Sequence, residues 1–117
     1  MTWVVDLHPL FGEEFKDFSE AVQDELLAEV ELLEKYGPDL GRPYVDTLNS
    51  SRHSNMKELR FKADNGVWRV AFAFDPERKA ILLVAGDKSG VSEKRFYKRL
   101  IKKADKRFDD HLREKKQ

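Results

Sequence analysis

The residues of this chain that could do chemistry are mainly arginines and lysines, because it contains no cysteine and only three scattered histidines. The candidates gather in or beside one segment, residues 56–88: His53, Lys57, Arg60, Arg69 and Lys88. Guanidinium and ammonium groups bind phosphate oxygens through charge-assisted hydrogen bonds and stabilise negative charge that develops during a reaction. A lysine can also act as a base where neighbouring cations lower its pKa, and the other members of this group would provide those neighbours.

One reaction suits such a set of side chains, namely metal-free cleavage of RNA by attack of a 2′-hydroxyl on its own phosphate. The reaction needs a base, cations around the phosphorus and an acid for the leaving oxygen. Each acid or base contributes roughly 10²–10⁴-fold. The sequence contains no glycine-rich nucleotide loop, no histidine-rich metal motif and no serine elbow. We therefore expect no metal and no cofactor.

The formal net charge of zero conceals a strong asymmetry between the two halves of the chain. Residues 1–51 contain 12 acidic and 3 basic residues, a balance of −9, whereas residues 52–117 contain 10 acidic and 19 basic residues, a balance of +9. Such asymmetry points to an anionic partner for the second half. Neutralisation of the basic strands by the acidic helix within the fold explains the same counts equally well.

Residues 56–88 are predicted to form three consecutive antiparallel strands, with turns at Asp64-Asn65-Gly66 and at Asp75-Pro76-Glu77. In the middle strand the large apolar side chains alternate with small ones and with Arg69. We expect the large face to pack on the core and the small face to form a cleft with an alanine floor. In the first strand Arg60 alternates with buried positions, so both guanidinium groups converge if the two faces coincide. The third strand should bring Lys88 to the edge of this cleft, on the same side as Leu82 and Val84.

The remaining segments are assigned from helical periodicity and from turn residues. We predict a strand at residues 1–7, a helical region at 9–37, a loop at 38–55 and a helix at 92–113. Ser19 is placed to cap a second helix within the helical region, whose acidic side chains, Glu29 included, are predicted to be solvated. The expected fold class is α+β, a single domain over 1–117, with an N-terminal strand and a two-helix hairpin packed on a three-stranded antiparallel meander with a C-terminal helix.

The C-terminal helix carries eight basic residues within fourteen positions, 94–107, more than favourable interaction with the helix dipole requires. We predict a surface that faces phosphates. The candidates for RNA or ribosome contact are Arg52, Lys62, Lys94, Lys98 and Lys102. No apolar run approaches the roughly 20 residues of a membrane span, and the lack of cysteine suits a reducing compartment. We expect a cytoplasmic protein without a membrane partner.

Several short segments together resemble the RelE/ParE toxin superfamily, and most closely its HigB or phage Gp49-like branch. They are Gly41-Arg42-Pro43, Arg52-His53, the run 55–60, Arg69-Val70, Gly86-Asp87-Lys88 and Ala104-Asp105 with His111-Leu112. The resemblance covers about residues 41–112. It implies a RelE-like fold and the toxin of a type II toxin–antitoxin system. Toxins of this branch are typically ribosome-dependent mRNA endonucleases that inhibit translation, and their antitoxin is usually a small helix-turn-helix DNA-binding protein.

The resemblance also implies roles for the basic residues. Arg60 and Arg69 would bind and stabilise the scissile phosphate, and Lys88 would be a phosphate ligand or the acid. Lys57 or His53 would be the base. Relatives also place a catalytic tyrosine or histidine near the C-terminus; Tyr97 and His111 are the possible counterparts, although their helical setting favours packing. The antitoxin is expected to cover or distort the cleft.

Two other functions fit the same sequence. The chain could be a toxin of this fold that binds and inhibits a protein target such as DNA gyrase, with no nuclease activity. It could also be an inactive relative that binds DNA together with its antitoxin. Loss of intact mRNA during expression would distinguish the nuclease from the other two.

Overall fold

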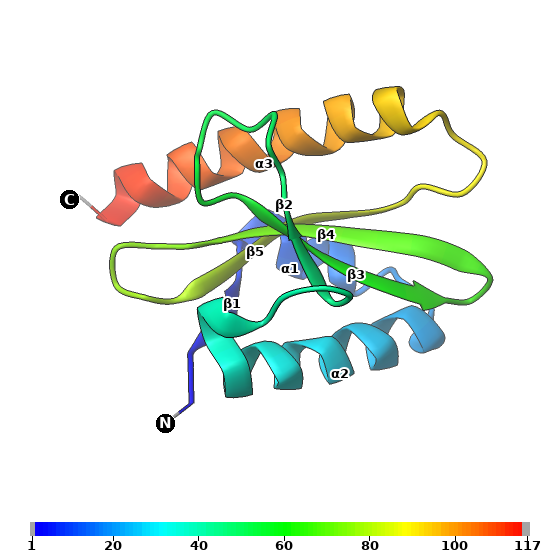
Figure 1. Cartoon of the computed structure of the whole chain (residues 1–117), viewed down its shortest axis with the longest axis horizontal. Coiled ribbons are helices and arrows are strands. Elements are labelled where there is room, and N and C mark those ends of the chain that lie inside the picture. The colour runs from blue at the N-terminus through cyan, green and yellow to red at the C-terminus, as the bar shows by residue number, and fades with distance from the viewer. Residues whose placement is uncertain (1, 116–117) are drawn as a thin grey trace.

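A computed structural model describes residues 2–115 and shows an α+β protein with three helices and a mixed sheet (Figure 1). The elements in chain order are β1 (Val5–Leu7), α1 (Pro9–Phe15), α2 (Glu20–Tyr36), the 3₁₀ helix η1 (Gly37–Asp39), β2 (Val45–Thr47), β3 (Lys57–Ala63), β4 (Gly66–Phe74), β5 (Ala80–Asp87) and α3 (Glu93–Lys115). The predicted fold class is confirmed, as are the three-stranded meander and the long C-terminal helix within it.

The sheet has five strands in the order β1-β5-β4-β3-β2, two more than the meander. The N-terminal strand is shorter than predicted and pairs in parallel with β5. The predicted loop at 38–55 also contains η1 and β2, and β2 pairs antiparallel with the outer edge of β3. Both short strands gain their hydrogen bonds from the meander, so their own three-residue sequences carry little signal.

The turns of the meander form as predicted, but a different pair of residues adopts the unusual backbone conformation. Asp64 and Asn65 have φ of 51° and 61°, and Gly66 already begins β4. Two successive residues with positive φ between antiparallel strands are typical of a type I′ hairpin turn, which asparagine and aspartate tolerate well. In the second turn, Arg78 takes positive φ, 66°, two residues after Pro76.

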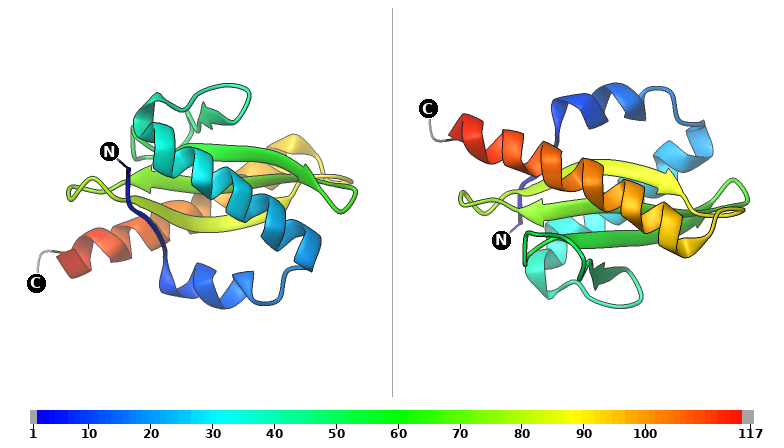
Figure 2. Two further views of the ribbon diagram at one scale, coloured as in Figure 1. Left: turned by 90° about the horizontal axis from the view of Figure 1, so that it is seen from below. Right: turned by 90° about the horizontal axis from the view of Figure 1, so that it is seen from above.

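Helices cover both faces of the sheet (Figure 2). On one face α2 contributes Val22, Leu26 and Leu33 to a core that includes Val70 and Phe72. On the other face α3 packs directly on Ala71 and Ala73, with its own residues Phe96, Leu100, Ala104 and Phe108. The predicted cleft with an alanine floor is therefore wrong. Small side chains on β4 allow the helix axis to approach the sheet, and the helix then fills the space above them.

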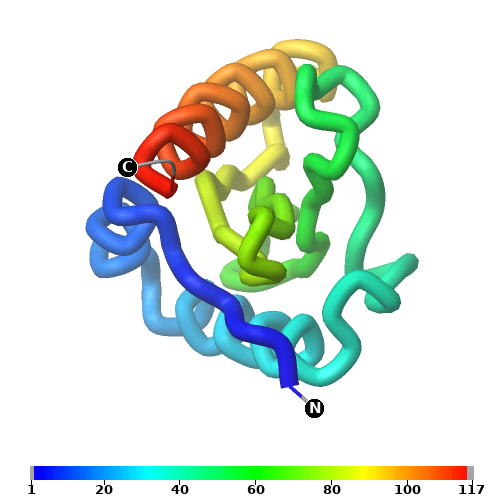
Figure 3. The backbone as a smooth tube through the Cα atoms, turned by 90° about the vertical axis from the view of Figure 1, so that its left-hand side faces the viewer, coloured from blue at the N-terminus to red at the C-terminus, as the bar shows by residue number. Residues whose placement is uncertain are grey.

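The helical region divides at Ser19, whose side chain accepts a hydrogen bond from the backbone N–H of Val22 at 3.3 Å, so the predicted cap is confirmed. The two helices do not form an antiparallel hairpin on one face. Helix α2 crosses the sheet over β3, whereas α1 lies beside β5, at the sheet edge between α2 and α3 (Figure 3). Their divergence leaves each helix with its own contact surface on the sheet.

A β-bulge in β5 changes which side chains share a face. Ala71 pairs with Val84, but Phe72 pairs with Leu82, so Leu83 is an extra residue. Leu83 and Val84 consequently both belong to the core under α3, while Leu82 belongs to the core under α2. The prediction that Leu82 and Val84 share a side was wrong for this reason.

Candidate phosphate-binding site

Arg60 and Arg69 are direct cross-strand partners on β3 and β4, so the predicted convergence of the two guanidinium groups is confirmed. Both residues lie on the sheet face that α3 covers. Like charges placed directly opposite one another destabilise a strand pair. Their juxtaposition therefore requires a nearby anion, from the protein or from a ligand.

Glu58 provides the anion, two residues before Arg60 and on the same face. It is buried, with its carboxylate oxygens 3.7 Å from Arg69 Nε and 3.9 Å from Arg60 Nε. Tyr97, from the first turns of α3, donates its hydroxyl to Glu58 Oε1 at 2.8 Å and accepts a hydrogen bond from Arg69 Nε at 3.3 Å. Arg69 also donates to the carbonyl of Trp68 at 2.9 Å. We call Glu58, Arg60, Arg69 and Tyr97 the charged cluster.

The environment of the charged cluster shifts two pKa values in the same direction. Burial raises the pKa of the Glu58 carboxyl above its ordinary value, against the opposing effects of the Tyr97 hydrogen bond and the two guanidinium charges. Burial and the bond to Glu58 likewise raise the pKa of Tyr97. A carboxyl with a raised pKa is better matched to proton transfer near neutral pH than an exposed one.

The two arginines differ in how much they face the solvent. The side chain of Arg69 is 7% exposed and that of Arg60 is 30% exposed. Among residues 2–115, Arg60 Nε has no hydrogen-bond partner although it is buried. Arg60 is therefore the residue that could meet a ligand, whereas Arg69 lies behind it and holds Glu58 and Tyr97 in place.

Lys88 belongs to the same neighbourhood, but Lys57 does not. Lys88 Nζ lies 2.6 Å from Glu93 Oε1 at the start of α3, and the charges of Arg69 and Arg60 also help to lower the pKa of Glu93, after the larger effect of Lys88. Lys57 alternates with Glu58 and pairs with Phe72, which places it on the opposite face, under α2. The structure brings together three of the four predicted basic residues.

His53 lies far from the charged cluster. Its Nε2 is 2.8 Å from Asp109 Oδ1 and its ring packs edge-on against Phe108, with ring centroids 4.9 Å apart. Position 109 is twelve residues beyond Tyr97, about 18 Å along the helix at 1.5 Å per residue. His53 therefore cannot share a substrate atom with Tyr97 in this arrangement.

Arg52 is tied down by the same part of α3. Its guanidinium pairs with Asp109, and its backbone N–H donates to Asp105 Oδ2 at 3.2 Å. Ser51 donates its hydroxyl to the same buried Asp105. The segment 51–53 therefore attaches the end of the preceding loop to helix α3. His111 has a similar packing role, since its ring lies 2.8 Å from Asp75 of the second turn.

The predicted basic surface of α3 is present, with one exception. Lys94, Lys98 and Lys102 of α3 are exposed, as is Lys62 of β3. Arg107 is instead buried, donating to both oxygens of Glu14 at 2.8 and 2.6 Å and to the carbonyl of Leu83 at 2.7 Å. The ion pair of Arg107 with Glu14 is the one that joins the acidic and basic halves among the described residues. Helices α2 and α3 cover opposite faces, so the acidic helix does not neutralise the basic one by contact.

Glu29 departs from the predicted solvated face of α2. It is 6% exposed, and its Oε2 has no hydrogen-bond partner within residues 2–115. Burial, with the nearby Glu25, raises the pKa of Glu29 to about 7. Helical spacing from Leu26 and Leu33 shows that the position faces the sheet, and this spacing was available in the sequence.

Sequence reasoning did not select Glu58 or treat Tyr97 as a group with polar partners. A usable signal for Glu58 was its position two residues before Arg60, which puts both on one face of a strand. No comparable signal exists for Tyr97, because its partners lie 28 and 39 residues away along the chain.

Within the described chain, no helix is long and apolar enough to cross a membrane, and no group of three acidic or histidine side chains is arranged to hold a metal ion.

Comparison with known proteins identifies the family to which this sequence is similar. The sequence pattern of the family described as phage-derived protein Gp49-like matches residues 13–109. HigB2, a candidate toxin of Mycobacterium tuberculosis, is 49% identical over 88 residues, which are 74% of this chain but 43% of HigB2. HigB3, a candidate toxin of the same organism, is 52% identical over 83 residues, 71% of this chain and 70% of HigB3.

Two solved structures share the fold at low sequence identity. A free, doubly substituted variant of the E. coli toxin RelE superposes with a TM-score of 0.60 at 12% identity, covering 88% of this chain and 97% of RelE. The archaeal RelE–RelB complex from Pyrococcus horikoshii gives a TM-score of 0.56 at 19% identity, covering 78% of this chain and 100% of the matched one. These likenesses confirm the RelE-like fold. The family match and the two sequence relatives show that the chain belongs to the phage-derived Gp49-like family, together with HigB-type proteins.

Proposed function

We propose that this protein is the toxin of a type II toxin–antitoxin system and that it cleaves mRNA on the ribosome without a metal ion, which inhibits translation. The charged cluster is the observation that carries this proposal. It combines an accessible guanidinium, a buried carboxyl with a raised pKa and a tyrosine hydroxyl bonded to that carboxyl. A cation for the phosphate and a route for a proton are the elements that 2′-hydroxyl attack requires.

In the proposed reaction Arg60 binds the scissile phosphate and neutralises the charge that builds up on it. The 2′-hydroxyl gives its proton to the oxygen of Tyr97 while Tyr97 passes its own proton to Glu58. The 2′-oxygen bonds to phosphorus and the bond from phosphorus to the 5′-oxygen breaks, leaving a cyclic phosphate and a 5′-hydroxyl. Lys88, released from Glu93, supplies the proton to the leaving 5′-oxygen.

Tyr44 offers this substrate a further contact. The backbone N–H of Arg60 donates to the carbonyl of Tyr44 at 2.8 Å, directly before the β2–β3 register begins, and Tyr44 is 41% exposed. Alternation places Tyr44 on the face that carries Arg60, because its neighbour Val45 belongs to the core under α2. An aromatic side chain beside a phosphate site can stack a nucleobase, worth about 1–3 kcal/mol per base.

The proposal includes an antitoxin partner and a cytoplasmic site of action. Support for the partner comes from the archaeal structural neighbour, which was solved as a complex of RelE with RelB. The exposed lysines of α3 are suited to ribosomal RNA. If they contact phosphates, log affinity falls linearly with log salt by about 0.7–0.9 per contact.

A map of mRNA 5′ ends after a short pulse of expression tests the nuclease. New ends inside translated regions are expected for the wild type and for the control Lys16→Gln, a change at the exposed residue after α1, outside the charged cluster. They should disappear with Tyr97→Phe and with Arg60→Gln. Growth arrest with intact transcripts and damaged DNA would instead favour inhibition of a protein such as DNA gyrase. Absence of both effects would leave an inactive relative.

A further inference from the structure

Strand β5 has an unpaired edge along its second half. Strand β1 pairs only with Ala80, Ile81 and Leu82, and the last hydrogen bond on that side runs from the N–H of His8 to the carbonyl of Leu82. β5 continues to Asp87, and in residues 2–115 no other strand pairs with this edge. An exposed strand edge carries a row of backbone donors and acceptors that can pair with another chain.

The register with β4 identifies the groups that this edge presents. Lys88 donates its N–H to the carbonyl of Val67, and Gly86 pairs with Arg69, so the even-numbered residues face β4. In an antiparallel pair the intervening residues direct their backbone groups to the other side. The N–H and C=O of Ala85 and the N–H of Asp87 therefore point away from the sheet.

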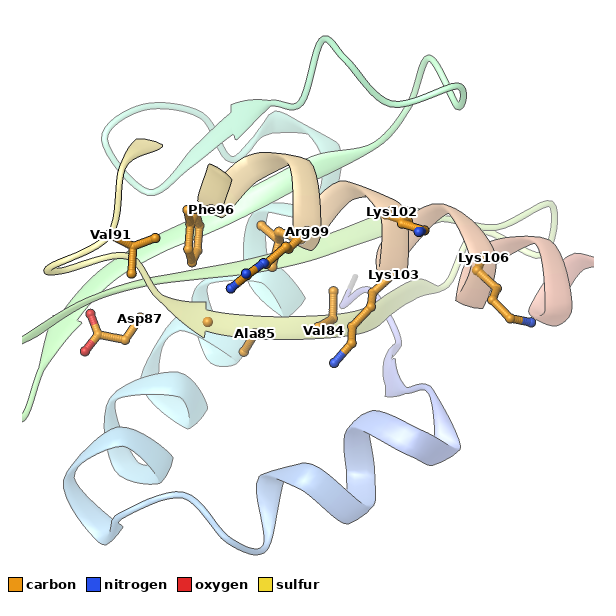
Figure 4. A pocket seen from close by; sticks show the side chains of 11 residues that line it. Val84, Ala85, Asp87, Val91, Phe96, Arg99, Lys102, Lys103 and Lys106 are labelled. Carbon is orange, nitrogen blue, oxygen red and sulfur yellow. The ribbon is translucent and has the colours of Figure 1, made fainter. Parts of the chain in front are cut away.

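A groove of about 540 Å³ runs between this edge and α3 (Figure 4). Arg99 and Lys103 lie four residues apart on one face of α3, and both side chains extend towards β5. Lys102 and Lys106 also line the groove, and Val91 and Phe96 line its other end. Within the described part of the chain, Arg99, Lys102 and Lys103 make no ion pair, so their charges are available to a ligand.

We propose that this groove binds an extended acidic peptide segment of a partner protein, which adds to β5 as a further strand. Backbone hydrogen bonds to Ala85 and Asp87 supply affinity, the cations of α3 select acidic side chains, and Val91 with Phe96 accepts an apolar one. An extended peptide matches the strand spacing of the outward N–H and C=O groups of Ala85 and Asp87, which a sugar–phosphate backbone does not, and this favours a peptide over RNA. The inference names how the antitoxin of the proposed function would bind, and it rests on that partner but not on RNA cleavage.

The probe is a fluorescein-labelled ten-residue peptide of alternating glutamate and valine, added to the full ¹⁵N-labelled chain. Fluorescence anisotropy gives the affinity, and backbone amide spectra report the residues whose environment changes. We expect the largest shifts at the amides of Ala85 and Asp87, and no binding of the matched lysine–valine peptide. Failure of the acidic peptide to shift these amides at millimolar concentration would overturn the inference.

Two variants and one control make the test specific. The Ala85→Pro variant removes the outward N–H at a position where an edge strand tolerates proline. The charge-reversed variant combines Arg99→Glu with Lys103→Glu, which changes two cations that line the groove into anions. Each should weaken the peptide at least tenfold, whereas Lys98→Glu, exposed on α3 outside the groove, should change affinity less than twofold. Equal affinity of the wild type and the charge-reversed variant would contradict the inference even if the proline variant failed to fold.

A decauridine competitor separates the peptide from the alternative ligand. If it displaces the peptide and shifts the amide of Asp87 as strongly in the proline variant as in the wild type, the groove is an RNA channel and the inference fails. The proline variant, which leaves every cation of α3 in place, should still cleave mRNA if the proposed function holds. Loss of cleavage in Tyr97→Phe with retained peptide binding would support both proposals. A wild-type chain that cleaves mRNA but does not bind the peptide would refute only this one.

Discussion

The two sides of α3 deal with charge in opposite ways. On the side of β3 and β4, Tyr97 reaches Glu58 and Arg69, and the charged cluster is wholly or largely covered, with Glu58 as the counter-charge of both arginines. On the side of β5, Arg99 and Lys103 stand over an open groove without any ion pair among residues 2–115. A charge removed from water must be paired within the protein, whereas a solvated charge needs no internal partner and can pair with a ligand.

If both proposals hold, this difference separates chemistry from recognition on one helix. Residues 96 and 97 of α3 mark the division, since Phe96 packs against Gly86 at the groove and Tyr97 belongs to the charged cluster. A partner bound in the groove would not have to fill the charged cluster. The earlier expectation that an antitoxin covers the phosphate site thus remains a prediction that a complex would test.

The largest effect on stability is expected from a substitution within the charged cluster. Arg69→Ala removes the guanidinium beside the buried Glu58, and loss of one partner of a buried ion pair typically costs about 3–5 kcal/mol. Urea denaturation measures the change. The double variant with Glu58→Gln should recover part of the loss, because it removes the stranded charge. A single variant as stable as the wild type would show that solvent reaches Glu58.

Glu29 is a buried carboxyl without a cation beside it, and it can be compared with Glu58 of the charged cluster. Its pKa is raised to about 7 in the folded protein, so the folded state holds the proton more tightly than the unfolded one between about pH 4.5 and 7. Stability from this group is complete below that window and is lost as pH rises through it. Glu29→Gln should therefore stabilise the protein at pH 8 by about 3 kcal/mol, at 1.36 kcal/mol per pKa unit.

Thermal unfolding at pH 4 and pH 8 checks this prediction. The advantage of the glutamine variant should vanish at pH 4, where the wild-type carboxyl is protonated in both states. Glu58, whose pKa is also raised, should show the same sign, with stability lost as pH rises through its folded pKa. An advantage that is constant with pH would rule out ionisation as its cause.

A smaller loss of stability is expected for Tyr97→Phe, which keeps the ring but removes the hydroxyl between Glu58 and Arg69. A buried acceptor left without its donor costs about 1–3 kcal/mol, and Arg69 remains close enough to offset part of this. If Tyr97 carries the proton, cleavage should fall about 10²–10⁴-fold. A cleavage rate within twofold of the wild type would leave Tyr97 as a positioning residue only.

The smallest effect on stability is expected at the groove. Arg99→Gln and Lys103→Gln remove exposed charges, and such substitutions usually change stability by less than about 0.5 kcal/mol. Their effect should appear instead in the salt dependence of binding of the glutamate–valine peptide, which should become shallower. Destabilisation comparable to that of Arg69→Ala would show that the folded state depends on the charges on both sides of α3 to the same extent.

Local features of the fold and site were readable from the sequence. The turn residues, the cap at Ser19 and the convergence of Arg60 with Arg69 depend on interactions between close neighbours or on the two-residue period of strands. The same period would have separated Lys57 from Arg60, since three positions along a strand lead to opposite faces. The relation of His53 to Asp109 could not be predicted, because the two residues are 56 positions apart in the chain.

What the sequence by itself determined is the three-stranded meander, the main helices and the faces of β3 and β4, since these follow from short-range periodicity. Only the tertiary structure decided that α3 lies over Ala71 and Ala73, that the bulge at Leu83 reassigns the end of β5, and that Tyr97 completes the charged cluster. The physical reason is that an amphipathic helix carries no information about which apolar surface it covers. That choice comes from the packing of the whole core, and here it turned a predicted cleft into a buried, paired site and opened a groove beside it.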